Sequence, residues 1–419
     1  MFKTLGNAWK IADLRKKILY TIFMLLIYRV GVIIPVPGVN ASYVAESVGS
    51  YTALEFLNMM SGGGLENMSI FALGISPYLN ASIVMNLLTI AIPALERLSK
   101  DGEDGQKKIS KITRYVAVAL GLIQAVGILW GLGSSAVEST DLFNYITIFL
   151  CLTAGTALMM WMGEQINQKG IGNGISLLIF TGLVAEVPGQ AISLISAMIS
   201  GELSILAFIG VIIGVLVIIT AITYVDQGER RVPVQYAKRV VGRKMYGGQA
   251  TFIPIKVNQS GVMPIIFAMT FVQFPAMVAQ FWPNSAFYTW YTKFLGTGSV
   301  LYALIYAVLI IFFTYFYSQI AFNPVDVSKN IQQYGGFIPG IRPGKPTSDY
   351  LSRILSKLTL FGAVFLAILA VIPTLFTQIT KLTSTFSATG LLIMVSVALE
   401  TAQLLEAQMM MRHYKGFLN

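Results

Sequence analysis

The sequence predicts an all-α polytopic membrane protein with ten transmembrane helices in two inverted halves. Three observations lead to this fold class: the composition, the succession of apolar segments and the placement of Lys and Arg. Of the 419 residues, 55% are hydrophobic and only 11% are charged, whereas a soluble chain carries about 25% charged residues. A soluble protein this apolar could not cover its surface with polar groups, so most of the chain must face lipid or other buried helices.

Nine segments are long and apolar enough to cross the hydrocarbon core, which requires about 20 residues of helix. A tenth, Ile175–Val187, is short and ends at Glu186 and Pro188, so hydropathy alone leaves it undecided. The nine are Ile18–Ile34, Gly74–Ile92, Tyr115–Gly133, Leu142–Gly163, Ile205–Val225, Val262–Phe281, Leu301–Phe322, Leu358–Phe376 and Ser387–Leu405.

The distribution of Lys and Arg decides both the number of spans and their orientation. Five precede the first span, six lie between the second and third, seven lie between Val225 and Val262, and five follow the eighth; the alternate loops hold almost none. Because basic residues stay on the cytoplasmic side, both termini are predicted to be cytoplasmic. If Ile175–Val187 did not cross, the loop with seven basic residues would lie outside. Ten spans is therefore the consistent number.

Ten spans divide into an N-terminal half, 1–190, and a C-terminal half, 191–419. Because five is an odd number, a second half built like the first would enter the membrane from the opposite face. That is the inverted-repeat architecture of many transport proteins. The halves share no convincing residue-level similarity, so this expectation rests on the count of spans.

Enzymatic and ion-coupled functions find little support. Arg29 and Glu400 are the ionisable groups inside the spans, with no evident partner at the same depth, whereas ion-coupled carriers usually hold several such groups. A single histidine, His413, excludes a His-pair metal site, and a single cysteine, Cys151, excludes an intramolecular disulfide. No phosphate-binding GxxxxGK[ST] sequence occurs, and the Gly170–Gly174 cluster is typical of a tight turn into the next helix. We expect a protein that is not an enzyme and has no cofactor.

An unusual segment, Asn58–Gly74, lies before the second span. It contains three consecutive glycines, Gly62, Gly63 and Gly64, each of which costs a helix about 1 kcal/mol relative to alanine. The following Glu66–Leu73 is predicted to form a short helix. Irregular backbone at membrane depth is tolerated only where protein or a water-filled cavity shields it. An ordinary loop at the outer face remains the alternative.

A second unusual segment is the cytosolic loop 226–260. Arg231–Tyr236 and Thr251–Val257 alternate in the manner of strands, and basic residues gather between them, with Arg243 and Lys244 at the tip. The pattern predicts a finger with a cationic tip. Topological charge alone would explain the sign of these residues, but not a length of roughly 35 residues, which is long for a simple connection.

The third unusual segment is Phe337–Pro346, within the cytosolic loop 323–357. Proline and glycine on both sides of Arg342 predict a rigid turn that presents this cation. A cation fixed on a loop is a candidate docking group for an acidic protein surface or for nucleic-acid phosphate. A plain solvated turn is the alternative.

Together these segments, in this order within ten spans, resemble the SecY family of central subunits of bacterial protein-conducting channels. The resemblance covers essentially the whole chain. It implies two halves in a clamshell around an hourglass pore, a short plug helix that closes the outer funnel, and a lateral seam that opens to lipid. The motifs that carry it are Ile70–Tyr78, Gly170–Ser176, Tyr236–Arg239 and Phe337–Gly344.

The resemblance also implies roles for individual residues. Its pore ring would be Leu79, Ile83, Ile179, Leu183, Ile266 and Ile393; its plug would lie within Ser61–Leu73 and include Ser61, Gly62, Gly63, Gly64, Leu65, Glu66, Asn67, Met68, Ser69 and Ile70. Thr89 and Gln124 would lie at the lateral gate, and Arg243, Lys244 and Arg342 would dock a partner. The pairs 79/83 and 179/183 each share one helix face. An aliphatic ring suits a pore because a narrow apolar throat seals by dewetting and offers no hydrogen bonds to a passing chain.

The implied function is passage of unfolded secretory polypeptides across the bacterial plasma membrane and lateral release of transmembrane segments into lipid. The implied partners are the SecE and SecG subunits, the SecA ATPase, the ribosome, and signal sequences of nascent or secretory polypeptides. The alternative is a secondary carrier for a small apolar solute, and a third hypothesis is a lipid scramblase or a structural scaffold. Carriers rarely need a long basic cytosolic finger, which favours the channel.

Overall fold

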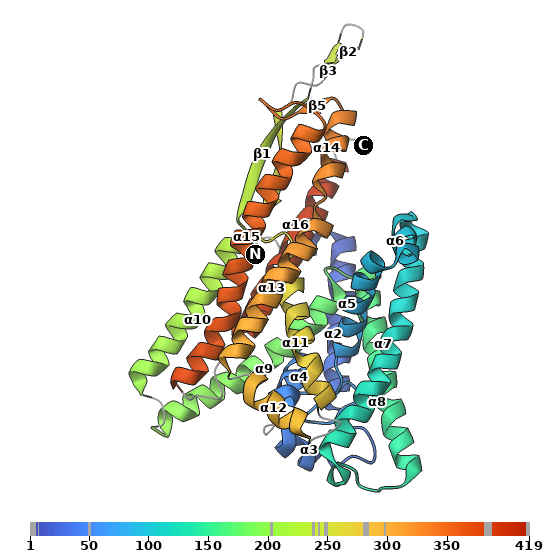
Figure 1. Cartoon of the computed structure of the whole chain (residues 1–419), viewed down its shortest axis with the longest axis vertical. Helices are drawn as coiled ribbons and strands as arrows, with labels where there is room; N and C mark the ends of the chain where they lie inside the picture. The colour runs from blue at the N-terminus through green and yellow to red at the C-terminus, as the bar shows by residue number, and fades with distance from the viewer. Residues whose placement is uncertain are drawn as a thin grey trace.

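The chain folds into a bundle of long helices with a β-finger at one end (Figure 1). In this computed structural model the described residues are 6, 8–48, 52–201, 204–236, 239–241, 244–246, 250–279, 285–296, 299–380 and 388–415. Helices account for most of them. The structure thus confirms the predicted helical class, with a small sheet formed by the finger and residues 336–337.

Each of the ten predicted spans corresponds to a helix. By length and hydropathy alone, seven of the described helices could cross a membrane, or eight if α5 and α6 (Pro93–Lys100), bent by 100°, form one broken span. α11 is a shorter apolar helix, and the basic residues of α2 keep it out of this set. The ten helices are α2 (Ala12–Ile33), α5 (Ser76–Ala91), α7 (Gly102–Leu132), α8 (Leu142–Lys169), α9 (Gly174–Ile199), α10 (Ile205–Asp226), α11 (Met263–Ala279), α13 (Val300–Ala321), α15 (Lys345–Thr380) and α16 (Ala388–Lys415).

The marginal fifth span proves to be a full-length helix. α9 has 26 residues and continues through Pro188, so the predicted end at Val187 is wrong. Membrane helices tolerate an internal proline because neighbouring groups satisfy the freed carbonyl. At its start, Asn173 Oδ1 accepts a hydrogen bond from the backbone N–H of Ile175 at 3.1 Å. The Gly170–Gly174 cluster is therefore the turn that leads into α9, as predicted.

Shorter elements connect the long helices: α3 (Ala41–Val48), α4 (Thr52–Ser61), the 3₁₀ turn Ser134–Ala136, α12 (Ala286–Leu295) and α14 (Pro324–Gln333). The long helices form two groups. α5 packs on α7, and α8 packs on both α7 and α2; in the other group α13 packs on α15, and α10 on α16. α11 lies between the groups and contacts both α5 and α13 (Figure 1).

The predicted finger is a three-stranded antiparallel sheet with a hairpin beyond it. β1 (Glu229–Tyr236) pairs with β4 (Ala250–Lys256), with Val232 opposite Ile253. β2 (Arg239–Val241) and β3 (Lys244–Tyr246) extend the hairpin away from the helices (Figure 1). These strands confirm the alternation seen in the sequence. The third strand, β5 (Gly336–Phe337), pairs with the other edge of β1, and the sequence did not predict it.

The loops 226–260 and 323–357 share one small hydrophobic core. Val232, Val234 and Ile255 from the strands pack against Ile331 of α14 and Leu351 of α15. All five are at most 6% exposed. Because this core joins the two loops, the finger and the turn at Arg342 form one packed unit instead of two independent loops.

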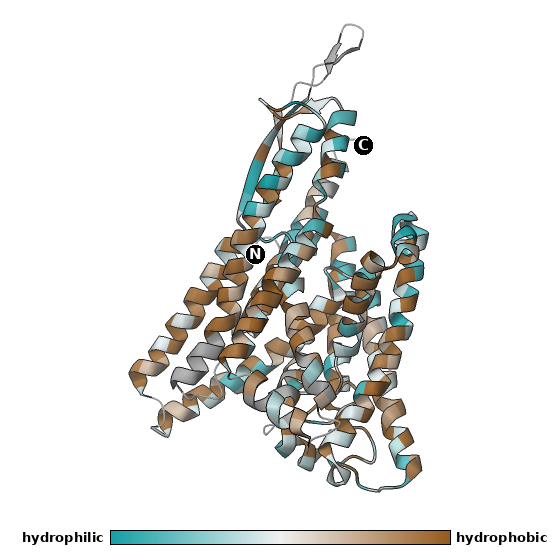
Figure 2. Ribbon diagram, viewed as in Figure 1, coloured by the Kyte–Doolittle hydropathy of each residue, from teal (hydrophilic) through white to brown (hydrophobic). Residues whose placement is uncertain are grey.

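Hydropathy divides the molecule along its long axis. Apolar residues cover the helical body, including the outward faces of α10 and α13, whereas hydrophilic residues gather on the finger, α14 and α6 (Figure 2). Leu206 and Leu216 of α10 and Val308 of α13 are more than half exposed. An exposed apolar surface of this extent is what a helical body surrounded by lipid requires.

Candidate functional site

The six predicted pore-ring residues lie in one buried hydrophobic cluster. They come from four helices, two in each half of the sequence, and none is more than 5% exposed. Ile179 and Ile393 are each 1% exposed. The six are Leu79 and Ile83 of α5, Ile179 and Leu183 of α9, Ile266 of α11 and Ile393 of α16. Residues far apart in sequence are thus buried in one cluster to which both helix groups contribute; that they form a pore ring stays a prediction.

The predicted plug segment contains turns instead of a regular helix. α4 ends at Ser61, and no helical residue follows until Ser76. The prediction of a short helix at Glu66–Leu73 is therefore wrong. Gly62, Gly63 and Gly74 have φ of 66°, 84° and 58°, and Met68 has φ of 41°. Such left-handed backbone interrupts a helix and favours glycine.

Side chains of α2 and the backbone just after that helix hold this segment in place. Tyr28 Oη donates a hydrogen bond to Ser61 O at 2.8 Å, and Arg29 Nη1 donates one to Gly62 O at 2.9 Å. The N–H of Val36 also donates to Met68 O at 2.9 Å. Arg29, which had no evident partner in the sequence, thus binds the first residue of the glycine run.

Glycines allow the segment to pack closely against α8 and α9. A Cβ added to Gly155 of α8 would lie 1.9 Å from Ile70 O, and one added to Gly182 of α9 would lie 3.2 Å from Gly62 Cα. A Cβ added to Gly31 of α2 would lie 2.1 Å from the ring of Phe71. The packing depends on these missing side chains.

Gly155→Ala is expected to displace the Ser61–Leu73 segment, because the new methyl group would overlap the backbone oxygen of Ile70. Overpacking of this kind costs about 1–3 kcal/mol. Thermal unfolding of the purified protein measures the loss of stability. Gly214→Ala on α10 is the matched control, since a Cβ there meets nothing within 4 Å. Equal unfolding temperatures for the two variants would contradict the assigned contact.

A hydrogen bond joins the two helix groups close to the predicted pore ring. Asn86 Nδ2 of α5 donates to Tyr317 Oη of α13 at 3.0 Å, and the ring of Tyr317 lies 4.9 Å from that of Phe267 on α11. This pair was not predicted from the sequence. A signal existed: Asn86 follows Leu79 and Ile83 at the spacing of one helix face, so it was placed to face the other half.

The two predicted gate residues lie on neighbouring helices, Thr89 on α5 and Gln124 on α7. Thr89 Oγ1 donates to Asn86 O on its own helix at 2.7 Å, one turn from the bond to Tyr317. Gln124 is 7% exposed on α7, which packs on α5. Their role at a lateral gate stays a prediction.

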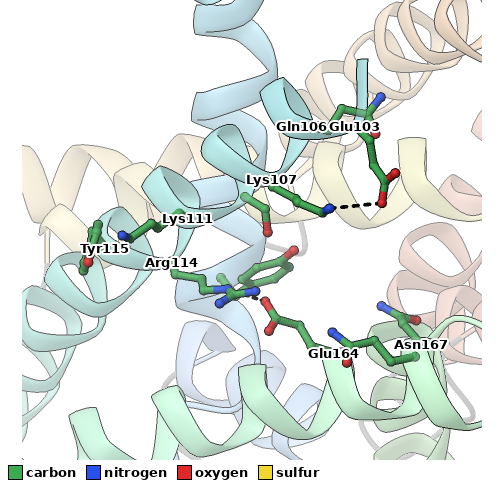
Figure 3. A pocket seen from close by; sticks show the side chains of 11 residues that line it. Glu103, Gln106, Lys107, Lys111, Arg114, Tyr115, Glu164 and Asn167 are labelled. Atoms are coloured by element: carbon green, nitrogen blue, oxygen red, sulfur yellow. Dashed lines mark hydrogen bonds and ion pairs between the residues drawn. The ribbon is translucent and has the colours of Figure 1, made fainter. Parts of the chain in front are cut away.

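An open polar cavity of about 720 Å³ lies between the ends of α7 and α8 (Figure 3). Arg114 Nε lies 2.6 Å from Glu164 Oε1, and Lys107 Nζ lies 3.2 Å from Glu103 Oε1. Lys107 and Glu103 are largely exposed, whereas Glu164 is only 19% exposed; exposed ion pairs stabilise a fold by only about 0–1 kcal/mol. Among the predicted site residues that the structure describes, none lines this cavity.

The backbone of the turn at Arg342 is held by side-chain hydrogen bonds, while the Arg342 side chain is exposed. The carbonyl of Arg342 accepts a hydrogen bond from Thr347 Oγ1 at 2.8 Å, and Ser328 Oγ donates to Gly344 O at 2.8 Å. Gly344 has φ of 95°, which only glycine adopts without strain. Of the other predicted docking residues, Lys244 begins β3, and Arg243 lies outside the described residues.

These features define a multi-pass helical membrane protein whose two helix groups meet at a buried aliphatic cluster. The chain belongs to the SecY family, whose model matches residues 69–402. It is 42% identical to the protein translocase subunit SecY of Mycobacterium bovis, over 100% of both chains.

Two solved structures have the same fold. One describes the SecY plug domain as stabilising the closed state of the translocation channel; it has a TM-score of 0.65 and 19% identity, over 94% of this chain and 92% of that one. The other is Sec61 in the canine ribosome-channel complex from the endoplasmic reticulum, with a TM-score of 0.61 and 16% identity over the same shares. The predicted resemblance to the SecY family is confirmed.

Proposed function

We propose that this chain is the protein-conducting channel subunit of a translocase. It passes unfolded secretory polypeptides across the membrane and releases transmembrane segments sideways into lipid. The observation that carries the proposal is the burial of six aliphatic residues, from two helices in each half of the sequence, in one hydrophobic cluster. Family membership and the fold of channel structures support it, whereas nothing supports the alternative of a carrier for a small apolar solute.

The aliphatic ring explains how such a channel transports a chain without leaking ions. Leu and Ile side chains form a narrow apolar throat, which water and ions occupy poorly. They offer no hydrogen bond that would retain a particular substrate side chain. At rest, the Ser61–Leu73 segment acts as the plug and closes one side of the throat. Two side-chain hydrogen bonds from Tyr28 and Arg29 hold it, with two backbone bonds between 34–36 and 68–70, few enough to break when a polypeptide enters.

The energy for transport comes from partners that dock on the unit formed by the finger and the turn at Arg342. The SecA ATPase and the ribosome are the proposed partners, since cationic groups bind both acidic protein surfaces and RNA phosphate. SecE and SecG are the proposed companion subunits, and signal sequences enter through the seam beside Asn86 and Tyr317. The halves 1–190 and 191–419 move against each other when that seam opens. The protein lies in the bacterial plasma membrane with both termini in the cytoplasm, as the positive-inside rule favours.

Cross-linking from a polypeptide arrested in transit tests this function. A photoreactive residue at mid-chain should attach to Ile83, Ile179 and Ile266 of the ring. It should not attach to Leu206, which faces outward on α10 and is 83% exposed. Attachment only to outward-facing residues such as Leu206 would refute the pore.

Asn86→Leu is expected to ease opening of the seam, because it removes the hydrogen bond to Tyr317 and leaves the apolar packing. Interhelical hydrogen bonds in membranes contribute about 0.6 kcal/mol on average, so transport of a substrate with a weakened signal sequence should rise about threefold. Tyr317→Phe removes the same bond from the other side and should give the same gain. A loss of transport in both variants would argue against a latch at this position.

A further inference from the structure

The carboxylate of Asp226 connects the base of the finger to helices α10 and α16. Asp226, the last residue of α10, accepts hydrogen bonds from Asn258 Nδ2 at 2.7 Å and from Ser396 Oγ at 2.5 Å. Asn258 lies in the link between β4 and α11, and Ser396 lies on α16. Three segments that are distant in sequence therefore meet at Asp226.

The cluster of Asp226, Asn258 and Ser396, called the joint below, is largely shielded from solvent. Asn258 is 6% exposed and Ser396 is 5% exposed, and with Asp226 they line a cavity of about 180 Å³. Hydrogen bonds to a carboxylate are about twice as strong as those between neutral groups, and a low local dielectric strengthens them further. A second bond runs parallel, from Lys256 Nζ of β4 to Gln403 Oε1 of α16 at 2.7 Å. The finger base and α16 are thus held as one body.

The joint lies close to two ring residues. Ser396 is three residues after Ile393 on α16, which is a rise of about 4.5 Å along the helix. Asn258 precedes Met263, the first residue of α11, and Ile266 lies in the first turn of that helix. Asp226 therefore touches both segments through which the C-terminal half supplies its ring residues.

We propose that Asp226 is a positioning residue that transmits displacement of the finger to the pore ring. Asp226 lies three residues before β1, so a displacement of the finger is transmitted to its carboxylate through a short link. Asn258 and Ser396 follow it, and Ile266 and Ile393 move with the helices that carry them. This inference rests on the proposed function, because it requires a pore and a docking finger.

Ser396→Ala and Asn258→Ala each remove one arm of the joint and leave the ring and the docking surface unchanged. The channel complex from native membranes, reconstituted in planar bilayers, is opened with translating ribosomes. The ribosome-induced open probability should fall about tenfold in each variant, within the usual range of coupling between sites. Ribosome affinity should be unchanged. Ser396→Thr, which keeps the hydroxyl, should restore opening.

Comparison of a double variant with its single variants distinguishes transmission through Asp226 from a general loss of protein stability. Once Asp226→Ala has removed the acceptor, adding Ser396→Ala should cause no further loss, since residues that act through one partner are not additive. Glu138→Gln is the control, an exposed acid between the 3₁₀ turn Ser134–Ala136 and α8, outside the finger and the ring. It should open normally.

The outcomes distinguish this inference from the proposed function. Normal opening of Ser396→Ala, or losses that add in the double variant, would overturn the role of Asp226 and leave the channel intact. Failure of ribosomes to open the unmodified channel would overturn the proposed function, and the inference with it.

Discussion

Arg342→Glu is expected to lower partner-driven transport to below about a tenth of normal while the protein still folds. The side chain is exposed on a turn whose backbone is fixed by Thr347 and Ser328, so the substitution changes charge without changing the fold. A reversed charge places repulsion where a partner's acidic or phosphate group would bind, and like charges at an interface cost several kcal/mol. Transport of a secretory protein into vesicles containing the variant measures the effect.

Arg353→Glu provides the matched control for this experiment. Arg353 is also exposed and lies on α15 in the same packed unit, so the change in net charge is identical. Its transport should remain close to normal. Equal loss in both variants would mean that the overall charge of the surface matters and that Arg342 has no specific docking role. Normal transport with Arg342→Glu would remove the docking role altogether.

Most of the fold could be predicted from the sequence because the bilayer imposes a simple rule on it. A spanning helix must be long and apolar, and the alternation of basic loops fixed the number of spans even where α9 was ambiguous. The strands of the finger were also predictable, since their alternation has a period of two. β5 was not predictable, because two residues carry no periodicity and pair with β1 only through tertiary contact.

The candidate site was predictable in part. The six aliphatic residues have no chemical signature of their own, and only the family resemblance distinguished them from other apolar positions. The Ser61–Leu73 segment was recognisable as irregular by its glycines, but local pattern could not reveal that Gly62 approaches Gly182 or that Arg29 binds Gly62 O. Asp226 was missed for the same reason. Its importance depends on Asn258 and Ser396, which are remote in sequence and meet only in the folded chain.

Ile83→Asn is expected to make the resting channel leak ions. The side chain is 5% exposed in the aliphatic cluster, and a buried amide without a partner costs about 1–3 kcal/mol. Recruiting water into the throat recovers part of this cost, so hydration of the ring becomes favourable and ions follow the water. The same argument applies to Ile393→Asn on α16, in the same cluster. The current across planar bilayers at rest, without any partner, should rise about tenfold, as a hydration barrier lower by 1.4 kcal/mol implies.

Two control variants decide whether the ring or the cluster as a whole provides the seal. Ile83→Leu keeps the aliphatic surface and should leave the resting current unchanged. Ile310→Asn on α13 places the same amide in the same cluster, at a residue that is 0% exposed but outside the ring. It should destabilise the protein without opening a conducting path, because the throat itself stays apolar. If Ile310→Asn leaked as much as Ile83→Asn, the seal would be a property of general packing and the six residues would have no special place in it.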